Sequence, residues 1–241
     1  ETTTGPLGQG LATSVGFAIA EELLRAQYGT KIINHHTYVL AGDGCLMEGI
    51  SQEAISLAGR QELSKLIVLW DNNNITIDGT VDLSDKTNQL MRFKASGWSV
   101  LEIDGHNPIE IDQAITVAKK SKSPTMISCK TNIALGTSAQ DTSKGHGALT
   151  DDDLISEAKT RYGWKYPKFE IPNDVKTMWE TIGSQGNAKF KTWQTNLELL
   201  TNKKRIELKR IFDRDLPAPL SRKLNQFKRQ ICNQKPSIAT R

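Results

Sequence analysis

The segment that decides the fold is VLAGDGCLMEG, residues 39–49, in which an aspartate lies between two glycines directly after an apolar run. The run that ends at Ala41 has the length and composition of a short buried strand. Asp43 would then lie at the carboxyl end of that strand, where α/β proteins with parallel sheets bind ligands. Gly42 and Gly44 let the backbone turn sharply and leave its amides open to a bulky group.

The sequence around this segment alternates between helical and strand patterns. Apolar residues at helical spacing predict helices, and short continuous apolar runs predict buried strands. The expected helices cover 10–29, 50–63, 85–96 and 108–120, and the expected strands cover 37–41, 65–71, 98–104 and 124–131. Strands that alternate with helices of this length predict an α/β fold, with right-handed crossovers and a parallel sheet sandwiched by helices.

The second half of the chain has a different character. Residues 131–150 follow neither period, and a loop of this length inside a compact domain is usually functional or disordered. A capping pattern at Thr150 and Asp153 predicts a helix that runs to about Tyr162. Residues 173–232 are helical in pattern and increasingly basic. We therefore expect two parts, residues 1–172 and a mainly helical basic segment at 173–241.

Charge and composition limit the classes of partner. The net charge is +4, and residues 200–241 carry twelve Lys and Arg against three acids, a balance of +9 that leaves −5 for the rest. This basic segment has only Phe212 and Phe227 as aromatics, so it indicates a solvated helical surface or an acidic partner rather than a nucleic-acid site. No run approaches the roughly 18 apolar residues of a membrane span, and no leader opens the chain. We expect a cytoplasmic protein that binds neither nucleic acid nor membrane.

A second polar motif completes a candidate metal site. The run KLIVLWDNNNITIDG, residues 65–79, ends a strand at Trp70 and delivers Asp71 and three asparagines. The 27 residues at 45–71 suffice for one loop, one helix and one return strand, so both motifs reach the same edge of the sheet. A carboxylate beside a helix start that binds anions would repel a phosphate unless a cation lay between the two groups. Mg²⁺ prefers oxygen ligands and is usually bound through one or two carboxylates together with substrate phosphates. Gly-Asp-Gly alone would indicate only a tight turn.

The order of the motifs resembles one enzyme family. ETTTGPLGQG at residues 1–10 is a rigid glycine-rich loop that enters a helix and suits a flat heterocycle lying against backbone. Together with GDGCLMEG, SLAG, DNNNITIDG, RFKASGW, GHGAL and GWKY…FEIP, it closely resembles transketolase. The resemblance covers the whole chain. It implies a thiamin diphosphate-binding fold, N-terminally incomplete at 1–172, with 173–241 leading toward a pyrimidine-binding domain outside this sequence.

The resemblance also implies ligands for the metal and the cofactor. Asp43, the side chain of Asn73 and the backbone carbonyl of Ile75 match the ligands of Mg²⁺ or Ca²⁺. The amide of Gly44 matches a ligand of the diphosphate, and Gly42 belongs to the same cofactor-binding turn. Asn72 stands where the family commonly has an aspartate, a charge that coordination should not need.

Further residues match the rings, the diphosphate and the substrate. Those on the cofactor are Gly5, Pro6 and Leu7 against its rings, and Asp71 and Ile133 near its thiazolium side. His146 resembles the histidine that contacts both the diphosphate and the substrate, and Arg241 matches the arginine that pairs with the sugar phosphate. The family pattern H-G-A-P-L is here HGAL after a shortened loop, which leaves the reach of His146 open.

The implied activity is transfer of a two-carbon glycolaldehyde unit from a ketose phosphate to an aldose phosphate, with thiamin diphosphate and Mg²⁺. The resemblance implies a homodimer in which the pyrimidine-binding domain of a second subunit supplies the activating glutamate, so we expect this chain to be inactive alone. One alternative is the cofactor-binding half of a split or silent transketolase-like protein that needs a partner chain. A deoxyxylulose-phosphate synthase or a 2-oxoacid dehydrogenase subunit shares the two metal motifs, but ETTTGPLGQG and GWKY…FEIP argue against both.

Overall fold

The computed structural model describes residues 2–237. The chain divides into two compact units, residues 1–181 and 182–241, and each is described by itself. The division falls inside helix α7, Asn173–Glu198, which begins at the boundary expected from the sequence. The assignment of 1–172 and 173–241 as separate domains stays a prediction.

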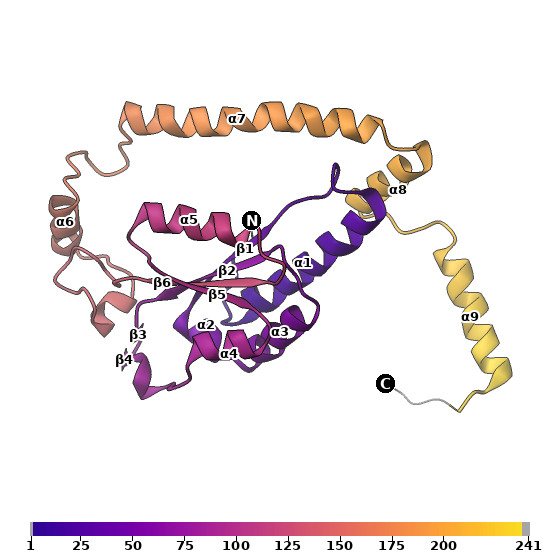
Figure 1. Ribbon diagram of the computed structural model, residues 1–241, viewed down its shortest axis with the longest axis horizontal. Helices are drawn as coiled ribbons and strands as arrows, with labels where there is room; N and C mark the ends of the chain where they lie inside the picture. The colour runs from indigo at the N-terminus through magenta and orange to yellow at the C-terminus, as the bar shows by residue number, and fades with distance from the viewer. Residues whose placement is uncertain (1, 238–241) are drawn as a thin grey trace. The chain divides into compact units, whose positions relative to one another are not determined.

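The first unit is built on a four-stranded parallel sheet (Figure 1). The strands lie in the order β1-β2-β6-β5, and their bounds are β1 Thr37–Gly42, β2 Leu66–Asn72, β5 Ser99–Asp104 and β6 Thr125–Lys130. Gly42 pairs with Asp71, and Asp71 pairs with Cys129. The residues that follow β1, β2 and β6 therefore meet at the carboxyl ends of these parallel strands.

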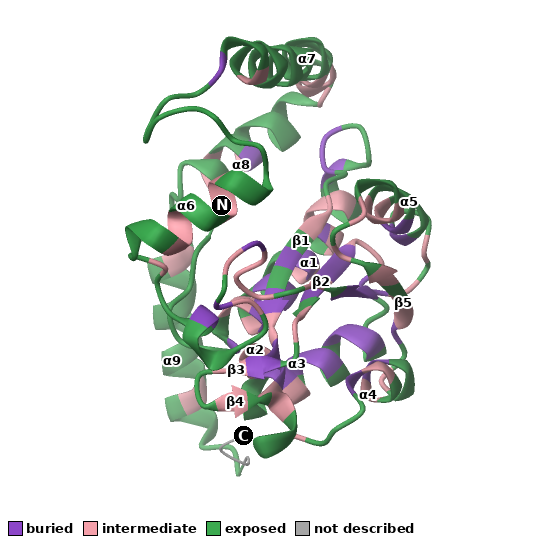
Figure 2. Cartoon of the chain, turned by 90° about the vertical axis from the view of Figure 1, so that its left-hand side faces the viewer, coloured by how far each residue is buried: buried purple, intermediate pink, exposed green. Residues whose placement is uncertain are grey.

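Helices cover both faces of this sheet. One face packs against α1 (Gln9–Tyr28), α3 (Gly49–Arg60) and α4 (Gln89–Ala95), and the other packs against α5 (Pro108–Ala118). Figure 2 shows the buried residues concentrated on the strands and on the helix faces turned to them. Alternate residues of β2 illustrate the pattern, because Val68 joins the first cluster and Ile67 the second. The predicted α/β fold with a parallel sheet sandwiched by helices is confirmed.

One aromatic pair anchors the larger core cluster. Phe93 of α4 is fully buried and meets Trp98 edge to face, with ring centroids 5.0 Å apart and planes at 88°. The indole Nε1 of Trp98 donates to the carbonyl of Ile55 in α3 at 2.9 Å. Edge-to-face contact and a satisfied indole fix the helices α3 and α4 against one another.

Strand β1 forms an open edge of the sheet. Among the described residues it pairs only with β2. Val39 and Ala41 point into the larger core cluster, whereas Leu40, on the opposite face, is 85% exposed. Ile67, which pairs with Tyr38 in register, is fully buried on that same face. Helix α5 thus covers this face of the sheet over β2 and β6, whereas the same face of β1 is exposed.

The structure departs from the expected elements in the stretch after β2. A small antiparallel hairpin forms there, with β3 at Ile75–Thr76 and β4 at Gly79–Thr80, followed by a short 3-10 turn at Val81–Leu83. The helix expected from residue 85 starts instead at Gln89. Its start is fixed by Asn88, whose side chain accepts a hydrogen bond from the amide of Met91.

The loop expected at 131–150 is largely irregular, as predicted, with one short 3-10 turn at Ser143–His146. Helix α6, Asp152–Arg161, follows it. Its N-cap is Asp151, whose carboxylate accepts from the amide of Asp153, so the prediction of a cap at Thr150 is wrong by one residue. Aspartate ranks above threonine as an N-cap residue, so of these two neighbours Asp151 takes the capping position.

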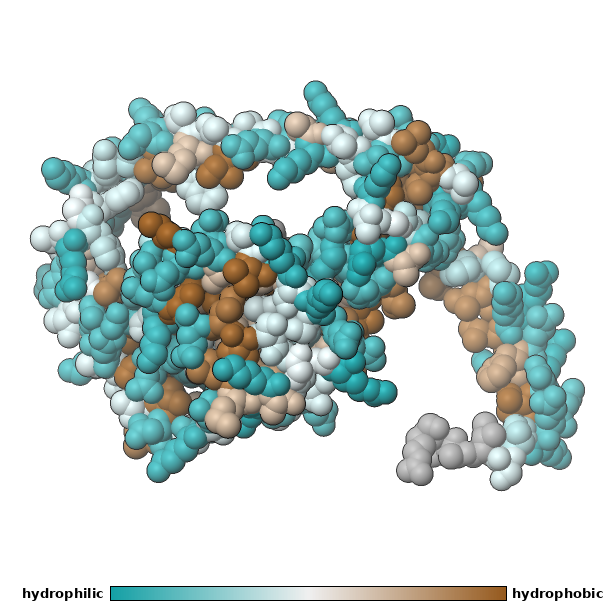
Figure 3. Space-filling model, in the orientation of Figure 1, coloured by the Kyte–Doolittle hydropathy of each residue, from teal (hydrophilic) through white to brown (hydrophobic). Residues whose placement is uncertain are grey.

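The second unit consists of helices with little buried surface. It holds the end of α7, then α8 (Asn202–Phe212) and α9 (Leu220–Gln234). Apolar residues of these helices lie exposed among hydrophilic ones (Figure 3). The mainly helical basic segment predicted after the sheet is confirmed. None of the helices in the described part of the chain is both long enough and apolar enough to span a bilayer.

Candidate functional site

Asp43 is a buried carboxylate with one oxygen lacking a partner. It begins the short helix α2 (Asp43–Met47) directly after β1 and is only 8% exposed. The indole Nε1 of Trp70, on β2, donates to its Oδ1 at 2.9 Å. Oδ2 is buried and makes no hydrogen bond to any described residue. A buried acceptor without a donor is costly, and the cost is greater when the group is charged.

The surroundings of Asp43 raise its pKa. Burial is the main cause, and the nearby Asp71 carboxylate adds to it. The hydrogen bond from Trp70 and the backbone amide of Asn74 act in the opposite direction, favouring the ionised form. Burial has the largest effect, and no ion pair to this carboxylate occurs among residues 2–237.

The two glycines beside Asp43 differ in the space around them: Gly42 has open space where a Cβ would lie, and Gly44 packs closely against Leu7. A Cβ added at Gly42 would meet nothing within 4 Å, and one at Gly44 would lie 3.0 Å from Cδ1 of Leu7. Gly8 has φ +78°, and a Cβ there would lie 2.8 Å from Cβ of Glu48. Only glycine suits that left-handed, crowded position. The N-terminal loop thereby packs against α2 and the start of α3, and the predicted residue Leu7 lies beside Gly44.

The asparagine motif after β2 is held by its own hydrogen bonds. Asn73 Nδ2 donates to Asp71 Oδ2 at 3.2 Å, and Asn73 Oδ1 accepts from the amide of Ile75 at 3.0 Å. The other oxygen of Asp71 accepts from the hydroxyl of Thr131. Asn74 adopts φ +62°, a left-handed conformation that asparagine tolerates better than most residues. The chain turns there into the hairpin that begins at Ile75.

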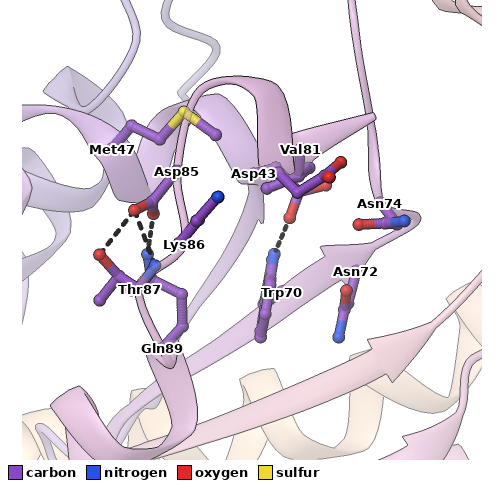
Figure 4. Close-up of a pocket in the computed structure, with 11 residues that line it drawn as sticks. Asp43, Met47, Trp70, Asn72, Asn74, Val81, Asp85, Lys86, Thr87 and Gln89 are labelled. Carbon is purple, nitrogen blue, oxygen red and sulfur yellow. Dashed lines mark hydrogen bonds between the residues drawn. The ribbon is translucent and has the colours of Figure 1, made fainter. Parts of the chain in front are cut away.

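A pocket of about 250 Å³ opens beside Asp43 (Figure 4). Asp43, Trp70, Asn72 and Asn74 line one part of it. The remaining lining residues are Met47, Val81, Asp82, Asp85, Lys86, Thr87 and Gln89. Asn73 is not among the lining residues. The structure thus brings Asp43 together with the asparagines on either side of Asn73, while the side chain of Asn73 engages Asp71 and Ile75.

No group of three His, Cys, Asp or Glu side chains suited to a metal occurs in the described part of the chain. The ligand set inferred from the sequence contains one carboxylate, one amide and one backbone carbonyl. Such a set suits a hard cation that keeps water and phosphate oxygens as further ligands. Asp43 with its unpartnered Oδ2 fits this role. The placements of Asn73 and Ile75 as ligands stay predictions.

The loop that carries His146 returns to the same region. His146 is exposed and ends the 3-10 turn, which packs near β3. A Cβ at Gly145 would lie 2.7 Å from Cβ of Ala134, so this glycine is needed for close packing within the loop. Ile133 accepts through its carbonyl from the amide of Asp141 at 3.1 Å. Arg241 lies outside the described residues.

Sequence reasoning missed several polar residues at this edge. The amide of Asn132 donates to Nε2 of His106 at 2.9 Å, and Nδ2 of Asn132 donates to both carboxylate oxygens of Asp141. His106 follows β5, and Thr131 follows β6 directly. Their positions just after strand ends were the one signal in the sequence that could have found them.

Comparison with known proteins decides the family. Residues 1–218 match the family model described as transketolase, thiamine diphosphate binding domain. The chain belongs to the transketolase family. It is 50% identical to the transketolase of Rhodobacter capsulatus over 242 aligned residues and 44% identical to that of Sinorhizobium medicae over 219. These alignments cover 100% and 90% of this chain but only 36% and 32% of the two relatives. The predicted resemblance is confirmed.

Solved transketolases agree with the fold of this family member. The Campylobacter jejuni transketolase superposes with a TM-score of 0.81 at 42% identity, covering 85% of this chain and 33% of the other. The transketolase from Leishmania mexicana gives a TM-score of 0.86 at 36% identity, covering 90% and 34%. This transketolase-family chain therefore spans about a third of the length of the relatives that it matches.

Proposed function

We propose that this chain forms the diphosphate- and metal-binding part of a transketolase, a transferase that moves a two-carbon glycolaldehyde unit from a ketose phosphate to an aldose phosphate. The observation that carries the proposal is the buried Asp43 carboxylate, whose Oδ2 has no partner among the described residues. A cation at this oxygen would offset the cost of its burial and lower the raised pKa. Membership of a thiamine diphosphate-binding family supports the same cofactor here.

Three protein oxygens would hold the cation, Mg²⁺ or Ca²⁺. They are an oxygen of Asp43, Oδ1 of Asn73 and the backbone carbonyl of Ile75. Asn73 Oδ1 has a second lone pair besides the one that accepts from the Ile75 amide, so it can bind a cation while keeping that hydrogen bond. The cation would neutralise the diphosphate and fix its position at the sheet edge.

Thiamin diphosphate, when bound, supplies the thiazolium carbon that accepts and donates the two-carbon unit. The amide of Gly44 would bind the diphosphate, and Gly5, Pro6 and Leu7 would lie against the rings. The contact between Leu7 and Gly44 supports these two assignments together. Asp71 and Ile133 would lie toward the thiazolium side of the bound cofactor. His146 would bind both the diphosphate and the substrate.

The complete active site needs parts from outside this chain. In this proposal a homodimer places the pyrimidine-binding domain of a second subunit over the cofactor, and Arg241 pairs with the sugar phosphate. We expect no glycolaldehyde transfer from the chain alone. A second candidate is the cofactor-binding half of a split or silent transketolase-like protein that works only with a partner chain.

Calorimetric titration of thiamin diphosphate with Mg²⁺ tests the site. Asp43→Ala should weaken binding about tenfold or more, since loss of about 1.4 kcal/mol corresponds to a factor of ten. Asp112→Ala removes an exposed carboxylate from α5 and should bind like the unaltered protein. Equal binding by Asp43→Ala and the unaltered protein would refute the metal assignment.

Adding a chain with the pyrimidine-binding domain of a transketolase separates the two candidates. Glycolaldehyde transfer in the mixture, assayed with a ketose phosphate and an aldose phosphate, supports an enzyme or an enzyme half. Cofactor binding without transfer, in a mixture shown to assemble, supports a silent protein.

A further inference from the structure

We propose that Asp71 and Thr131 are positioning residues that orient the amide of Asn73, so that its Oδ1 is available to the cation. The inference deepens the proposed function and rests on it. It assigns Asp71 a role through Asn73 and adds Thr131, 60 residues further along the chain, to the residues that build the site.

The orientation follows from the chemistry of the partners. An ionised carboxylate only accepts hydrogen bonds, so Asp71 Oδ2 can face only the NH₂ side of the Asn73 amide. The observed contact is Asn73 Nδ2 to Asp71 Oδ2 at 3.2 Å. Oδ1 is thereby turned the other way, where it accepts from the Ile75 amide at 3.0 Å. A flipped amide would set its oxygen against the carboxylate and present NH₂ to the cation.

Thr131 fixes the carboxylate that does the orienting. Its hydroxyl donates to Asp71 Oδ1, and its own amide donates to the carbonyl of Asn72 at 3.3 Å. Thr131 follows β6, which pairs with β2 through Asn72 and Lys130. With both oxygens of Asp71 engaged on different sides, rotation of its carboxylate breaks one hydrogen bond or the other.

The residues that follow β5 help to fix the position of Thr131. The next residue, Asn132, donates through its amide to His106 Nε2 and through its side chain to Asp141. A Cβ at Gly105 would lie 2.6 Å from Cγ2 of Thr131, so the ends of β5 and β6 approach as closely as a glycine allows. The position of Asn73 is therefore determined by residues after β2, β6 and β5.

The experiment compares two substitutions at one position. Thr131→Val keeps the shape and removes the hydroxyl, and Thr131→Ser keeps the hydroxyl. Thr160→Val is the matched control, since it removes a threonine hydroxyl that donates to the Ser156 carbonyl in α6. The measurement is the Mg²⁺ concentration that half-saturates binding of thiamin diphosphate, with the melting temperature of each metal-free variant recorded alongside.

Loss of the Thr131 hydroxyl should raise the half-saturating Mg²⁺ concentration about tenfold, in the range for residues that orient metal ligands. Thr131→Ser should restore most of the affinity, and Thr160→Val should leave it unchanged. An unchanged Mg²⁺ requirement in Thr131→Val overturns the inference. Equal weakening by Val and Ser together with lower melting temperatures also overturns it, because the role would then be structural.

A metal-free measurement tests the geometry directly. The side-chain amide protons of Asn73, followed by ¹⁵N-resolved NMR, should exchange with water faster in Thr131→Val than in Thr131→Ser. Equal exchange in the two variants contradicts the inference while leaving the proposed function intact. Failure of the unaltered protein to bind Mg²⁺ with thiamin diphosphate contradicts the proposed function, and the inference falls with it.

Discussion

The sheet unit buries many of its apolar residues, whereas the described part of the helical unit leaves most of its apolar residues exposed. In residues 1–181 the strands and helices α1 to α5 bury two clusters, with Phe93, Ile67 and Ile127 fully enclosed. In the described part of 182–241, Leu208 alone is buried, whereas residues such as Phe227 are largely exposed.

The difference shows what the two units rely on for stability. Burial of apolar area, at roughly 25 cal/mol per Å², is the main favourable contribution to folding. Short helices without packing are marginal in water, whatever their helix propensity. The sheet unit can therefore tolerate a costly group such as the Asp43 carboxylate. Helices α8 and α9 have no comparable reserve, and their order depends on what covers their apolar faces.

The largest change in the free energy of unfolding is expected for truncation of a buried core residue in the sheet unit. Phe93→Ala leaves a cavity beside Trp98 and should lower the free energy of unfolding by about 3–5 kcal/mol. Urea unfolding followed by tryptophan fluorescence measures the loss. Phe93→Leu, which keeps part of the volume, should lose less. A loss below about 1 kcal/mol for the alanine variant would mean that the core is not the source of stability.

A smaller effect, of opposite sign, is expected at the buried carboxylate. Without metal, Asp43→Asn should stabilise the protein by about 1 kcal/mol at neutral pH, since it removes a buried charge whose Oδ2 has no hydrogen-bond partner among the described residues. Trp70 can still donate to the amide oxygen. Chemical unfolding in excess chelator measures the change, and Asp112→Asn, at an exposed site, should have no effect.

The pH dependence of that effect has a definite sign. Burial raises the pKa of Asp43 above its ordinary value of 3.8, so the folded chain binds this proton more tightly than the unfolded chain. The contribution of Asp43 to stability is then greatest below 3.8 and declines as the pH rises through the raised pKa. The advantage of Asp43→Asn should therefore grow with pH. An advantage that is the same at acidic and neutral pH would contradict this assignment.

The smallest effect is expected in the helical unit. Phe227 of α9 is 58% exposed, so Phe227→Ala should change the free energy of unfolding by less than about 0.5 kcal/mol. The same urea titration used for Phe93→Ala measures it. A loss comparable to that of Phe93→Ala would break the comparison, because it would show that α9 is packed in solution.

The sequence predicted the sheet and the place of Asp43 well, for a physical reason. Strands buried on both faces read as continuous apolar runs, and KLIVLWD is such a run. The glycines around Asp43 mark a turn after a strand whatever the rest of the fold does. These signals are local, so a single sequence carries them.

The rest depended on which strands lie side by side. Strand β6 inserts between β2 and β5, and nothing local in the sequence states that order. Thr131 therefore could not be linked to Asp71, nor His106 to Asn132, before the sheet was known. The hairpin at β3 and β4 was missed because two residues per strand are too few to show a period. Arg241 lies outside the described residues, so its predicted role stays a prediction.

The unpaired side of the edge strand β1 should affect the solubility of this chain at high concentration. Its outer backbone amides and carbonyls are unpaired among the described residues, and Leu40 stands beside them almost fully exposed. Such a flank is a template on which further strands add, and natural sheets normally protect it with charge, proline or a cover. We expect self-association of the chain at high concentration to begin at this strand. A lysine in place of Leu40 should raise its solubility limit without disturbing the core beneath.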